Sequence, residues 1–449
     1  MTKEKMTENS GSLRIVRDFE DRMPIHHKLL EKKKIPRKIA SPREGRPLIR
    51  SRTFTKLKRG PSRAEIKAEA PRPTTPKYLK DNYDFDKSSS SEENVSDDDK
   101  DKKQQKPLDL SQKIYLAACE RDGIPPRKKL VKGLAESVLD VRNFLLVPED
   151  IKALSTALTS NMCVSSLNLY GNNIGREGVE YLVEMLEENM TITELNLSNT
   201  QIGLPEITIL AELLSENLRI TSFEAAGNNL DDDCAKCFAE ALKFNRKLKK
   251  LNLSNNSFQE NGGKILAKSL ETNDSITELD MSWNHIRLSG AVAWGEALYR
   301  NEELLYLNLS WNGFGDEGGA AIGEALEENQ TLLKLDLSNN RIGLDGCKGL
   351  AKGISLNTTL EYLSLSKNPL TTQGTTMLLN SINDNGESKI RTLLLEGIQV
   401  TQDTDSIVND IVEQFNNFTV VHGGYVMSPD ILTVKPKEPE EKKCRSSKS

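Results

Sequence analysis

The chain contains 449 residues, of which 28% are charged and 37% hydrophobic, and its mean hydropathy is -0.52. No apolar run reaches the roughly 18 residues that a membrane span needs, and none follows the charged first residues. We therefore predict neither a transmembrane helix nor a secretory signal peptide. The six cysteines are scattered, so we expect reduced thiols. These features exclude the secreted, membrane-spanning, collagenous and disulfide-scaffold classes and predict a cytoplasmic protein.

A basic head precedes an acidic body. Residues 1–60 contain 18 Lys or Arg and 7 Asp or Glu, a net charge of +11, which leaves -16 for the remainder because the whole chain carries -5. Residues 1–107 show no sustained helical or strand periodicity and are rich in Lys, Arg, Pro and Ser. We expect a disordered region that is first basic and then serine-rich and acidic, because it buries too little apolar surface to offset chain entropy.

The basic run of residues 32–38 leaves several interpretations open: binding to nucleic acid, to anionic lipid or to an acidic protein, or localisation to the nucleus. Nucleic-acid binding is disfavoured, because no aromatic residues interleave the run to stack on bases. The serine–acid run of residues 88–93 resembles substrates of acidophilic kinases, and phosphorylation there would add about −1.5 to −2 charges per site.

The body repeats with one period. The pattern L-x-L-x-x-N recurs from residue 139, and its first apolar position returns every 28 residues. The next unit begins at Leu393 instead of position 391, so the spacer before it is slightly longer. A late Asn and two apolar positions of helical spacing keep the same period, and three registers locked together do not arise from composition. The first apolar positions are Leu139, Leu167, Leu195, Phe223, Leu251, Leu279, Leu307, Leu335 and Leu363.

The repeat that begins at Leu307 illustrates the physical basis of every repeat. Leu307 and Leu309 alternate with polar residues, as a short strand requires, so both leucines face a core. A turn signal follows at residues 312–315. Ile322 and Leu326 are four residues apart and share one helix face, which can pack back on the strand leucines. Because no unit can bury that face alone, stacked units should form a parallel sheet on one side and helices on the other.

An Asn recurs at the turn of most units. Its amide offers two donors and an acceptor, so it can hydrogen-bond backbone groups of the turn that no regular ladder pairs. We expect these side chains to form a buried ladder of amides at one level of the stack. The turn asparagines are Asn172, Asn228, Asn256, Asn284, Asn312, Asn340 and Asn368.

This pattern resembles the leucine-rich repeat superfamily, and within it the ribonuclease-inhibitor type with a full helix in each unit. The resemblance covers roughly residues 110–425. It implies an α/β solenoid, or horseshoe, with a parallel β-sheet on the concave face and α-helices on the convex face. Residues 115–126 look like the N-terminal cap of this class, including tropomodulin-like proteins. Residues 279–284 and 290–293 look closest to the leucine-rich repeat-containing protein 74 group.

The expected organisation follows from these boundaries. Residues 108–138 should form a helical N-terminal cap, residues 139–392 the leucine-rich repeats of 28 residues, and residues 393–428 a C-terminal repeat and cap. Within the last part, residues 407–415 are expected to form a final helix and residues 419–421 a closing strand. Residues 429–449, charged and containing proline, are expected to be a disordered tail.

Three units depart from the pattern. Thr200 replaces the turn Asn, which leaves one hydroxyl in place of two amide bonds. Phe223 and Ala225 replace two strand leucines, and because their combined volume compensates, local repacking is expected. Near the C-terminus, Ile398 stands where the turn Asn is expected, which is typical of a capping unit.

The residues favour no catalytic site. The chain has four His, and no Ser/His/Asp or Cys/His set emerges. Cys234 and Cys237 form a lone C-x-x-C pair, whereas a structural zinc site needs four ligands. Residues 231–233 are better explained as acidic residues that begin a helix. No phosphate-binding G-x-x-x-x-G-K-[ST] motif is present in the sequence. We expect no enzyme activity, no cofactor, no metal and no small-molecule substrate.

The three tryptophans separate into two kinds. Trp294 falls on the helix-core register and is expected to be buried. Trp283 and Trp311 fall one residue before the turn Asn in adjacent repeats, so their rings should be neighbours at the rim of the concave sheet. Tyr306 lies on the same face. Such a Trp/Tyr cluster is typical of a protein-binding hot spot; the alternative is that Trp is simply tolerated there, packed on the neighbouring turn.

The concave face should be polar, and Asp280 and Asn308 belong to its central row. The predicted partner-binding residues are therefore Trp283, Trp311, Tyr306, Asp280 and Asn308. Without a basic stripe, the face does not favour a phosphate backbone. We therefore predict a non-catalytic scaffold that binds a protein partner. Two alternatives stay open: a GTPase-activating or other enzyme-regulatory leucine-rich repeat protein, and a cytoskeletal or ciliary adaptor.

Overall fold

The computed structural model describes residues 108–415 and 417–426, so the predictions for residues 1–107 and 429–449 lie outside the described chain. The described residues contain one sheet of 11 parallel strands, in which the spatial order follows the order in the sequence. The strands are β1 (Val138–Asp140), β2 (Ser166–Asn168), β3 (Glu194–Asn196), β4 (Ser222–Glu224), β5 (Lys250–Asn252), β6 (Glu278–Asp280), β7 (Tyr306–Asn308), β8 (Lys334–Asp336), β9 (Tyr362–Ser364), β10 (Thr392–Leu395) and β11 (Thr419–His422).

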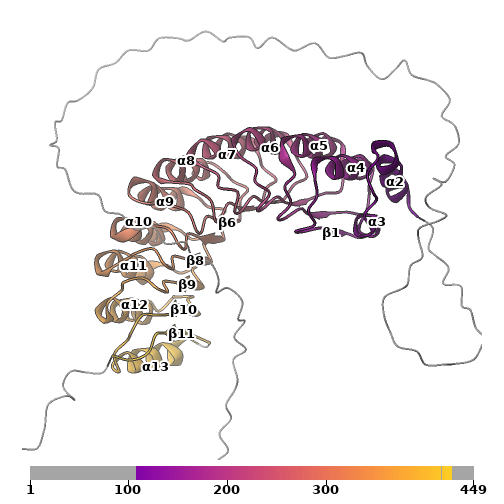
Figure 1. The fold of residues 1–449 in the computed structure, drawn as a ribbon. Coiled ribbons are helices and arrows are strands. Elements are labelled where there is room, and N and C mark those ends of the chain that lie inside the picture. Colours follow the sequence, from indigo (N-terminus) through magenta and orange to yellow (C-terminus); the bar gives the residue numbers. More distant parts are fainter. Residues whose placement is uncertain (1–107, 416, 427–449) are drawn as a thin grey trace, which may run out of the picture. The chain divides into compact units, whose positions relative to one another are not determined.

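A helix follows each strand from β1 to β10 and covers one face of the sheet, as Figure 1 shows. Within the described residues, two further helices, α2 and α3, precede β1. No helix in the described residues is both long and apolar enough to cross a membrane. The helices are α2 (Leu110–Asp122), α3 (Lys128–Gly133), α4 (Pro148–Leu158), α5 (Gly175–Glu188), α6 (Leu204–Glu216), α7 (Asp232–Phe244), α8 (Glu260–Leu270), α9 (Ser289–Arg300), α10 (Gly315–Glu328), α11 (Leu344–Leu356), α12 (Thr372–Asp384) and α13 (Thr404–Gln414).

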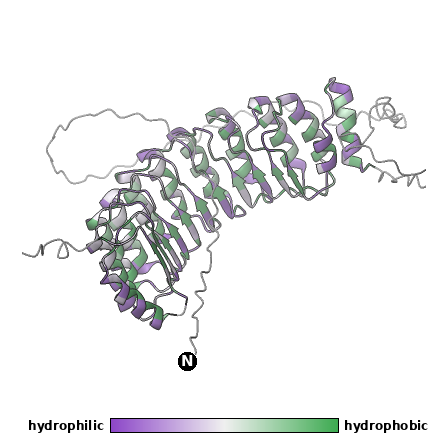
Figure 2. Ribbon diagram, turned by 60° about the horizontal axis from the view of Figure 1, so that its bottom comes forward, coloured by the Kyte–Doolittle hydropathy of each residue, from purple (hydrophilic) through white to green (hydrophobic). Residues whose placement is uncertain are grey.

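The strand register confirms the repeat period. Leu251 pairs with Leu279, and Leu279 with Leu307, as neighbouring rungs of the sheet. These leucines are buried, and each is flanked by partly exposed residues, as expected for a strand with one buried face. Hydrophobic residues lie on the strand and helix faces that meet, whereas hydrophilic residues lie outward (Figure 2). The core is therefore one continuous layer between sheet and helices.

The turn asparagines form the predicted buried ladder, and their bonds reach between repeats. The Asn256 Nδ2 donates to the Leu253 carbonyl in its own turn and to the Ala225 carbonyl in the preceding repeat. Its Oδ1 accepts from the backbone N–H groups of Asn228 and Leu230. Each amide thus pairs backbone groups of the turn before its own as well as its own turn, which explains why the position favours Asn over other polar residues.

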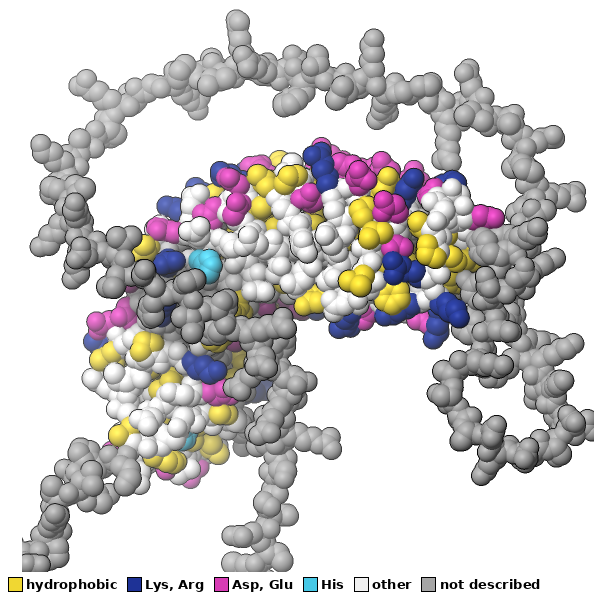
Figure 3. Space-filling model, in the orientation of Figure 1, with side chains coloured by type: hydrophobic (Ala, Val, Ile, Leu, Met, Phe, Trp, Pro, Cys, Tyr) yellow, Lys and Arg dark blue, Asp and Glu magenta, His cyan; other side chains and the backbone are white. Residues whose placement is uncertain are grey.

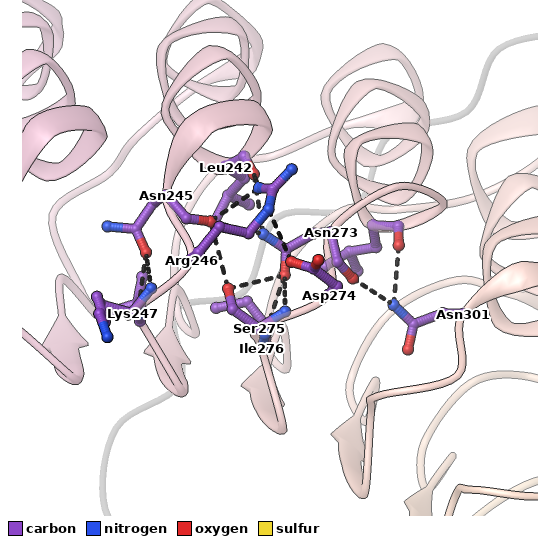
Figure 4. Close-up of polar contacts among 11 residues, drawn as sticks. Leu242, Asn245, Arg246, Lys247, Asn273, Asp274, Ser275, Ile276 and Asn301 are labelled. Atoms are coloured by element: carbon purple, nitrogen blue, oxygen red, sulfur yellow. Dashed lines mark hydrogen bonds and ion pairs between the residues drawn. The ribbon is translucent and has the colours of Figure 1, made fainter. Parts of the chain in front are cut away.

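A second ladder, which the sequence did not reveal as a bonding network, runs through the late asparagines (Figure 4). The Asn273 Nδ2 donates to the carbonyl oxygens of Leu242 at 2.8 Å and Asn245 at 3.4 Å. Its Oδ1 accepts from the backbone of Ser275 and Ile276. These amides close the connection from each helix to the next strand, so both edges of the stack are held by buried asparagines.

The departing units adjust locally. Buried Thr200 donates its hydroxyl to the Leu197 carbonyl at 2.6 Å, and its backbone N–H donates to Asn228 Oδ1 at 2.8 Å. The backbone N–H of Asn172, one repeat earlier, donates to the Leu169 carbonyl at 3.3 Å instead of to a side chain. Phe223 is buried and packs against Phe238 of α7, with ring centroids 6.3 Å apart, so the core accommodates the larger strand residue.

The two ends of the described chain differ from the repeats. At the first end, Asp109 caps α2 in a capping box with Gln112, and Arg127 forms a 2.6 Å ion pair with nearly buried Asp150 of α4. At the other end, Ile411 of α13 is buried and β11 pairs with β10 as the last strand. The outward faces of the helices are strongly charged, and acidic side chains gather over α5 and α6 (Figure 3).

Candidate protein-binding site

The five predicted partner-binding residues come from two adjacent repeats. Asp280 ends β6 and Asn308 ends β7, while Tyr306 begins β7. Trp283 and Trp311 lie in the turns that follow these strands. Because β6 and β7 pair in register, with Asp280 beside Asn308, the structure places equivalent side chains of the two repeats next to each other on the concave face.

The two tryptophan rings stack. Their centroids are 3.9 Å apart and the ring planes differ by 12°. The spacing follows from the strand separation of about 4.8 Å, which brings equivalent turn residues within stacking distance. Trp283 remains 46% exposed and Trp311 is partly exposed. The pair therefore presents a flat aromatic surface to solvent instead of contributing to the core.

Both tryptophans have left-handed backbone conformations, with φ of 55° at Trp283 and 56° at Trp311. A left-handed residue with a bulky side chain is strained, because its Cβ crowds the following carbonyl, at a cost of roughly 1–2 kcal/mol. All other repeats have positive φ at this position too, and most place there the residues that tolerate it. The residues at this position are Asn143, Gly171, Asn199, Gly227, Asn255, Asn339, Lys367 and Gly397, of which all but Lys367 are Gly or Asn.

Asp280 and Asn308 also have structural bonds. The Asn308 Nδ2 donates to Asp280 Oδ2 at 3.1 Å and so links the two strand ends. Asp280 Oδ1 accepts from the Ser282 backbone, and Asn308 Oδ1 accepts from that of Ser310. The same bond recurs after other strands, for example from Ser254 to Asn252. Part of the hydrogen-bonding capacity of this polar row is therefore used inside the protein.

Tyr306 lies at the opposite end of β7 from the turn. Burial, then the carboxylates of Asp280 and Asp336, raise the pKa of Tyr306 to about 12, so its hydroxyl stays protonated at neutral pH. Among the described residues, the tryptophans make ring contact with each other and not with Tyr306. The structure thus brings together the Trp pair and the Asp280–Asn308 pair, and it sets Tyr306 apart from the aromatic stack.

Asp336 is a concave-face residue whose character the sequence pattern did not reveal. It ends β8 beside Asn308, and burial raises the pKa of its carboxyl. Its Oδ1 accepts from the Ser338 backbone at 2.8 Å. Glu224 of β4 is similar, because burial and the neighbouring Glu194 raise its pKa. The pattern marked both positions as polar, but only the packed structure shows that they are poorly solvated.

The described residues contain no group of three or more His, Cys, Asp and Glu side chains placed to hold a metal ion. Asp231 caps α7 by accepting from the backbone of Asp233 and Cys234, which confirms the helix-start interpretation. Burial raises the pKa of Cys234 to about 12, so it remains a thiol. Trp294 is buried, as predicted.

The family model described as Leucine Rich repeat matches seven segments of the chain, at residues 160–183, 188–205, 244–267, 272–293, 300–323, 328–351 and 356–379. Together with the single parallel sheet and its regular helices, these matches decide the fold. The described residues form a solenoid of leucine-rich repeats, and seven segments of it match the family model.

Three solved structures show partial similarity to this chain. An internalin from Listeria monocytogenes is 14% identical, with 71% of this chain and 90% of that chain covered and a TM-score of 0.41. Leiomodin-1 actin-binding site 2 is 23% identical, with 40% and 88% covered and a TM-score of 0.27. The C-terminal domain of tropomodulin from Caenorhabditis elegans is 23% identical, with 33% and 92% covered and a TM-score of 0.30.

Proposed function

We propose that this leucine-rich repeat protein is a non-catalytic interaction scaffold that binds a protein partner on its concave face, with the stacked Trp283–Trp311 pair at the centre of the contact. One observation carries the proposal: two adjacent repeats place a solvent-accessible tryptophan where the backbone is left-handed, although Gly and Asn serve the fold there in neighbouring repeats. Strain that the fold does not require is a feature of functional positions.

The energetics support a tryptophan hot spot. Large aromatic side chains contribute most to protein–protein contacts, because they bury much apolar area and lose few rotamers on binding. The pair is already stacked, so neither ring has to be ordered when a partner arrives. Asp280 and Asp336 lie on the same face and add acceptors and negative charge. A partner segment with an apolar or cationic group for the aromatic surface and donors for the carboxylates fits this arrangement.

We also propose a repeat type and a protein group for this chain. The full helix in each unit supports the ribonuclease-inhibitor type, and the turn sequence of residues 279–284 supports membership of the leucine-rich repeat-containing protein 74 group. A cytoplasmic location, and the absence of catalysis, cofactors and small-molecule substrates, are parts of this proposal that rest on the sequence.

Quantitative affinity purification with the full chain tests the site. The double variant Trp283→Asn, Trp311→Asn removes both rings while it keeps a residue that other repeats use at this position. We expect partner capture to weaken by over ~2 kcal/mol, about 30-fold, with the free energy of unfolding unchanged or higher because strain is relieved. The double variant Asn255→Gly, Asn339→Gly, in the flanking repeats, is the matched control and should capture partners normally. If the tryptophan variant captured partners as well as the natural protein does, the Trp283–Trp311 pair would not be the binding site.

A further inference from the structure

A second surface feature lies away from the concave face, in the loops that join helices to strands. Met162, Met190 and Leu218 occupy the same position in three consecutive repeats, directly after a buried ladder Asn, and are 72%, 61% and 70% exposed. The fold does not demand apolar residues there, because later repeats have polar ones. The later residues are Arg246, Asp274, Glu302, Gln330 and Thr358.

The three side chains belong to successive rungs of one edge. The Thr191 hydroxyl, next to Met190, donates to the Asn161 carbonyl at 3.1 Å, directly before Met162. The Arg219 guanidinium, next to Leu218, contacts the Met190 sulfur. Consecutive exposed apolar residues on a protein surface mark an interaction site more often than isolated ones do.

Carboxylates border the Leu218 end of this apolar row. Glu187 of α5 and Glu212 and Glu216 of α6 line a surface hollow of about 410 Å³ together with Leu218 and Arg219. Helices α5 and α6 together contain eight glutamates and one arginine, which Figure 3 shows as the acidic region over these helices. We call Met162, Met190, Leu218 and the three lining glutamates the acidic–apolar patch. Among the described residues that line the hollow, three are glutamates and one, Arg219, is cationic, so the net charge of the patch is negative.

We propose that the acidic–apolar patch binds the basic segment of residues 29–39 of the same chain. That segment combines four apolar residues, Leu29, Leu30, Ile35 and Ile39, with five cationic residues, Lys32, Lys33, Lys34, Arg37 and Lys38, and one acid, Glu31. An apolar row beside carboxylates is complementary to this composition, because apolar contacts supply affinity and opposite charges fix the register.

The covalent connection favours this occupant over an external one. Leu108, where the described chain begins, packs on the core beside α2, which contacts α4, and α4 contacts α5. Residues 40–107 connect the segment to this point, and their contour length exceeds ~200 Å at about 3.3 Å per residue, so the patch is within reach. A tether turns binding into an intramolecular event with a raised effective concentration.

The acidic stretch that follows the basic segment would regulate its binding to the patch. Residues 92–101 of the connecting chain contain six acidic residues and one basic residue, and four serines precede them at residues 88–91. This stretch competes for the basic segment. Phosphorylation would add about −1.5 to −2 charges per serine and shift the competition away from the patch.

Zero-length carbodiimide cross-linking of the full chain, read by mass spectrometry, tests the proposal, because this reagent joins a lysine amine to a carboxylate in direct contact. We expect Lys32–Lys34 to cross-link to Glu187, Glu212 and Glu216 roughly tenfold more often than to Glu324, Glu327 and Glu328 of the equally acidic α10. The double variant Met190→Lys, Leu218→Lys should lose this preference. The double variant Gln330→Lys, Thr358→Lys, at the same repeat position elsewhere, should keep it.

Circular dichroism of each variant checks that the fold is intact, which is expected because every substitution lies outside the core. A mixture of isotope-labelled and unlabelled chains separates intramolecular links from links to a second copy. Equal cross-linking to α5–α6 and α10, links only between copies, or links confined to residues 92–101 would each overturn the proposal. Loss of the preference in the Gln330/Thr358 variant would also overturn it.

Discussion

The backbone N–H of Asn340 donates to the side-chain Oδ1 of Asn368, one repeat later, at 2.8 Å. The same oxygen accepts from Ile342 at 3.1 Å, while the Asn368 Nδ2 donates to the carbonyls of Leu337 and Leu365. One buried amide therefore pairs four backbone groups across two repeats. Because backbone groups without partners are costly inside a protein, this amide contributes to the junction as well as to its own turn.

Replacement of Asn368 by Ala should destabilise the solenoid by about 3 kcal/mol or more, because two buried donors and two buried acceptors lose a partner at ~1–3 kcal/mol for each group left unpaired. Urea unfolding followed by circular dichroism measures the change. Gln330→Ala, on the exposed surface, is the control and should be nearly neutral. A loss below about 1 kcal/mol would show that water replaces the amide.

Thr200→Asn should have the opposite effect. At this rung, the backbone N–H of Asn172 has only a 3.3 Å bond within its own turn. An amide at position 200 supplies a side-chain acceptor like those that the backbone N–H groups of Asn228 and Asn340 have, and it can still donate to the Leu197 carbonyl that the threonine hydroxyl now contacts. We expect a gain of about 1 kcal/mol in the free energy of unfolding, measured by urea titration. Destabilisation would mean that the neighbouring strand with Phe223 and Ala225 cannot accommodate the amide.

Gly353 marks a close approach of helices α10 and α11. A Cβ at Gly353 would lie 2.1 Å from the carbonyl oxygen of Gly323, which no side-chain movement can relieve. Gly353→Ala should therefore destabilise the protein by roughly 1–3 kcal/mol, as overpacking does. Thermal unfolding measures the loss. Gly203→Ala is the control, because its added Cβ would have no neighbour nearer than 3.7 Å. Equal behaviour of the two variants would contradict the close contact.

Asp336→Asn should make the protein more stable at neutral pH. Burial raises the pKa of this carboxyl in the folded state, so folding favours its protonated form. The stability of the natural protein therefore falls as the pH rises from the unfolded pKa, about 3.9, through the folded pKa. The variant lacks this penalty and keeps the acceptor for Ser338, as Asn308 does in its own turn.

The advantage of Asp336→Asn should be complete above the folded pKa and should vanish below about pH 3.9, where both side chains are neutral. Urea unfolding at several pH values measures it. A variant that is less stable at neutral pH, or equally altered at every pH, would indicate that the carboxylate has a favourable partner.

Most of the fold could be predicted from the sequence, because the repeat length fixes the register. Once Leu251, Leu279 and Leu307 recur at one constant spacing with alternating neighbours, parallel stacking is the arrangement that buries them all. The second ladder was harder to foresee, because Asn273 bonds to the distant carbonyl of Leu242, and only the packed backbone brings these groups together.

The candidate site was predictable in position and not in conformation. Repeat spacing placed Trp283 beside Trp311, and the rings do stack. The sequence pattern treated Tyr306 as part of the same cluster, whereas the structure sets it at the other end of β7. The left-handed backbone had a signal in the sequence, since Gly171, Asn199 and other repeats supply residues that tolerate positive φ. Which carboxylates are poorly solvated depends on side-chain packing that no linear pattern specifies.

The direction of the amide ladder bears on how the protein is made. The acceptor for each turn lies one full unit further along the chain, so a turn emerging during translation has to wait for the next unit before its N–H groups are paired. Folding on the ribosome should then lag synthesis by one unit. Ile398 stands where the acceptor for the turn of Asn368 is expected, so this turn lacks the amide, and unravelling should begin there.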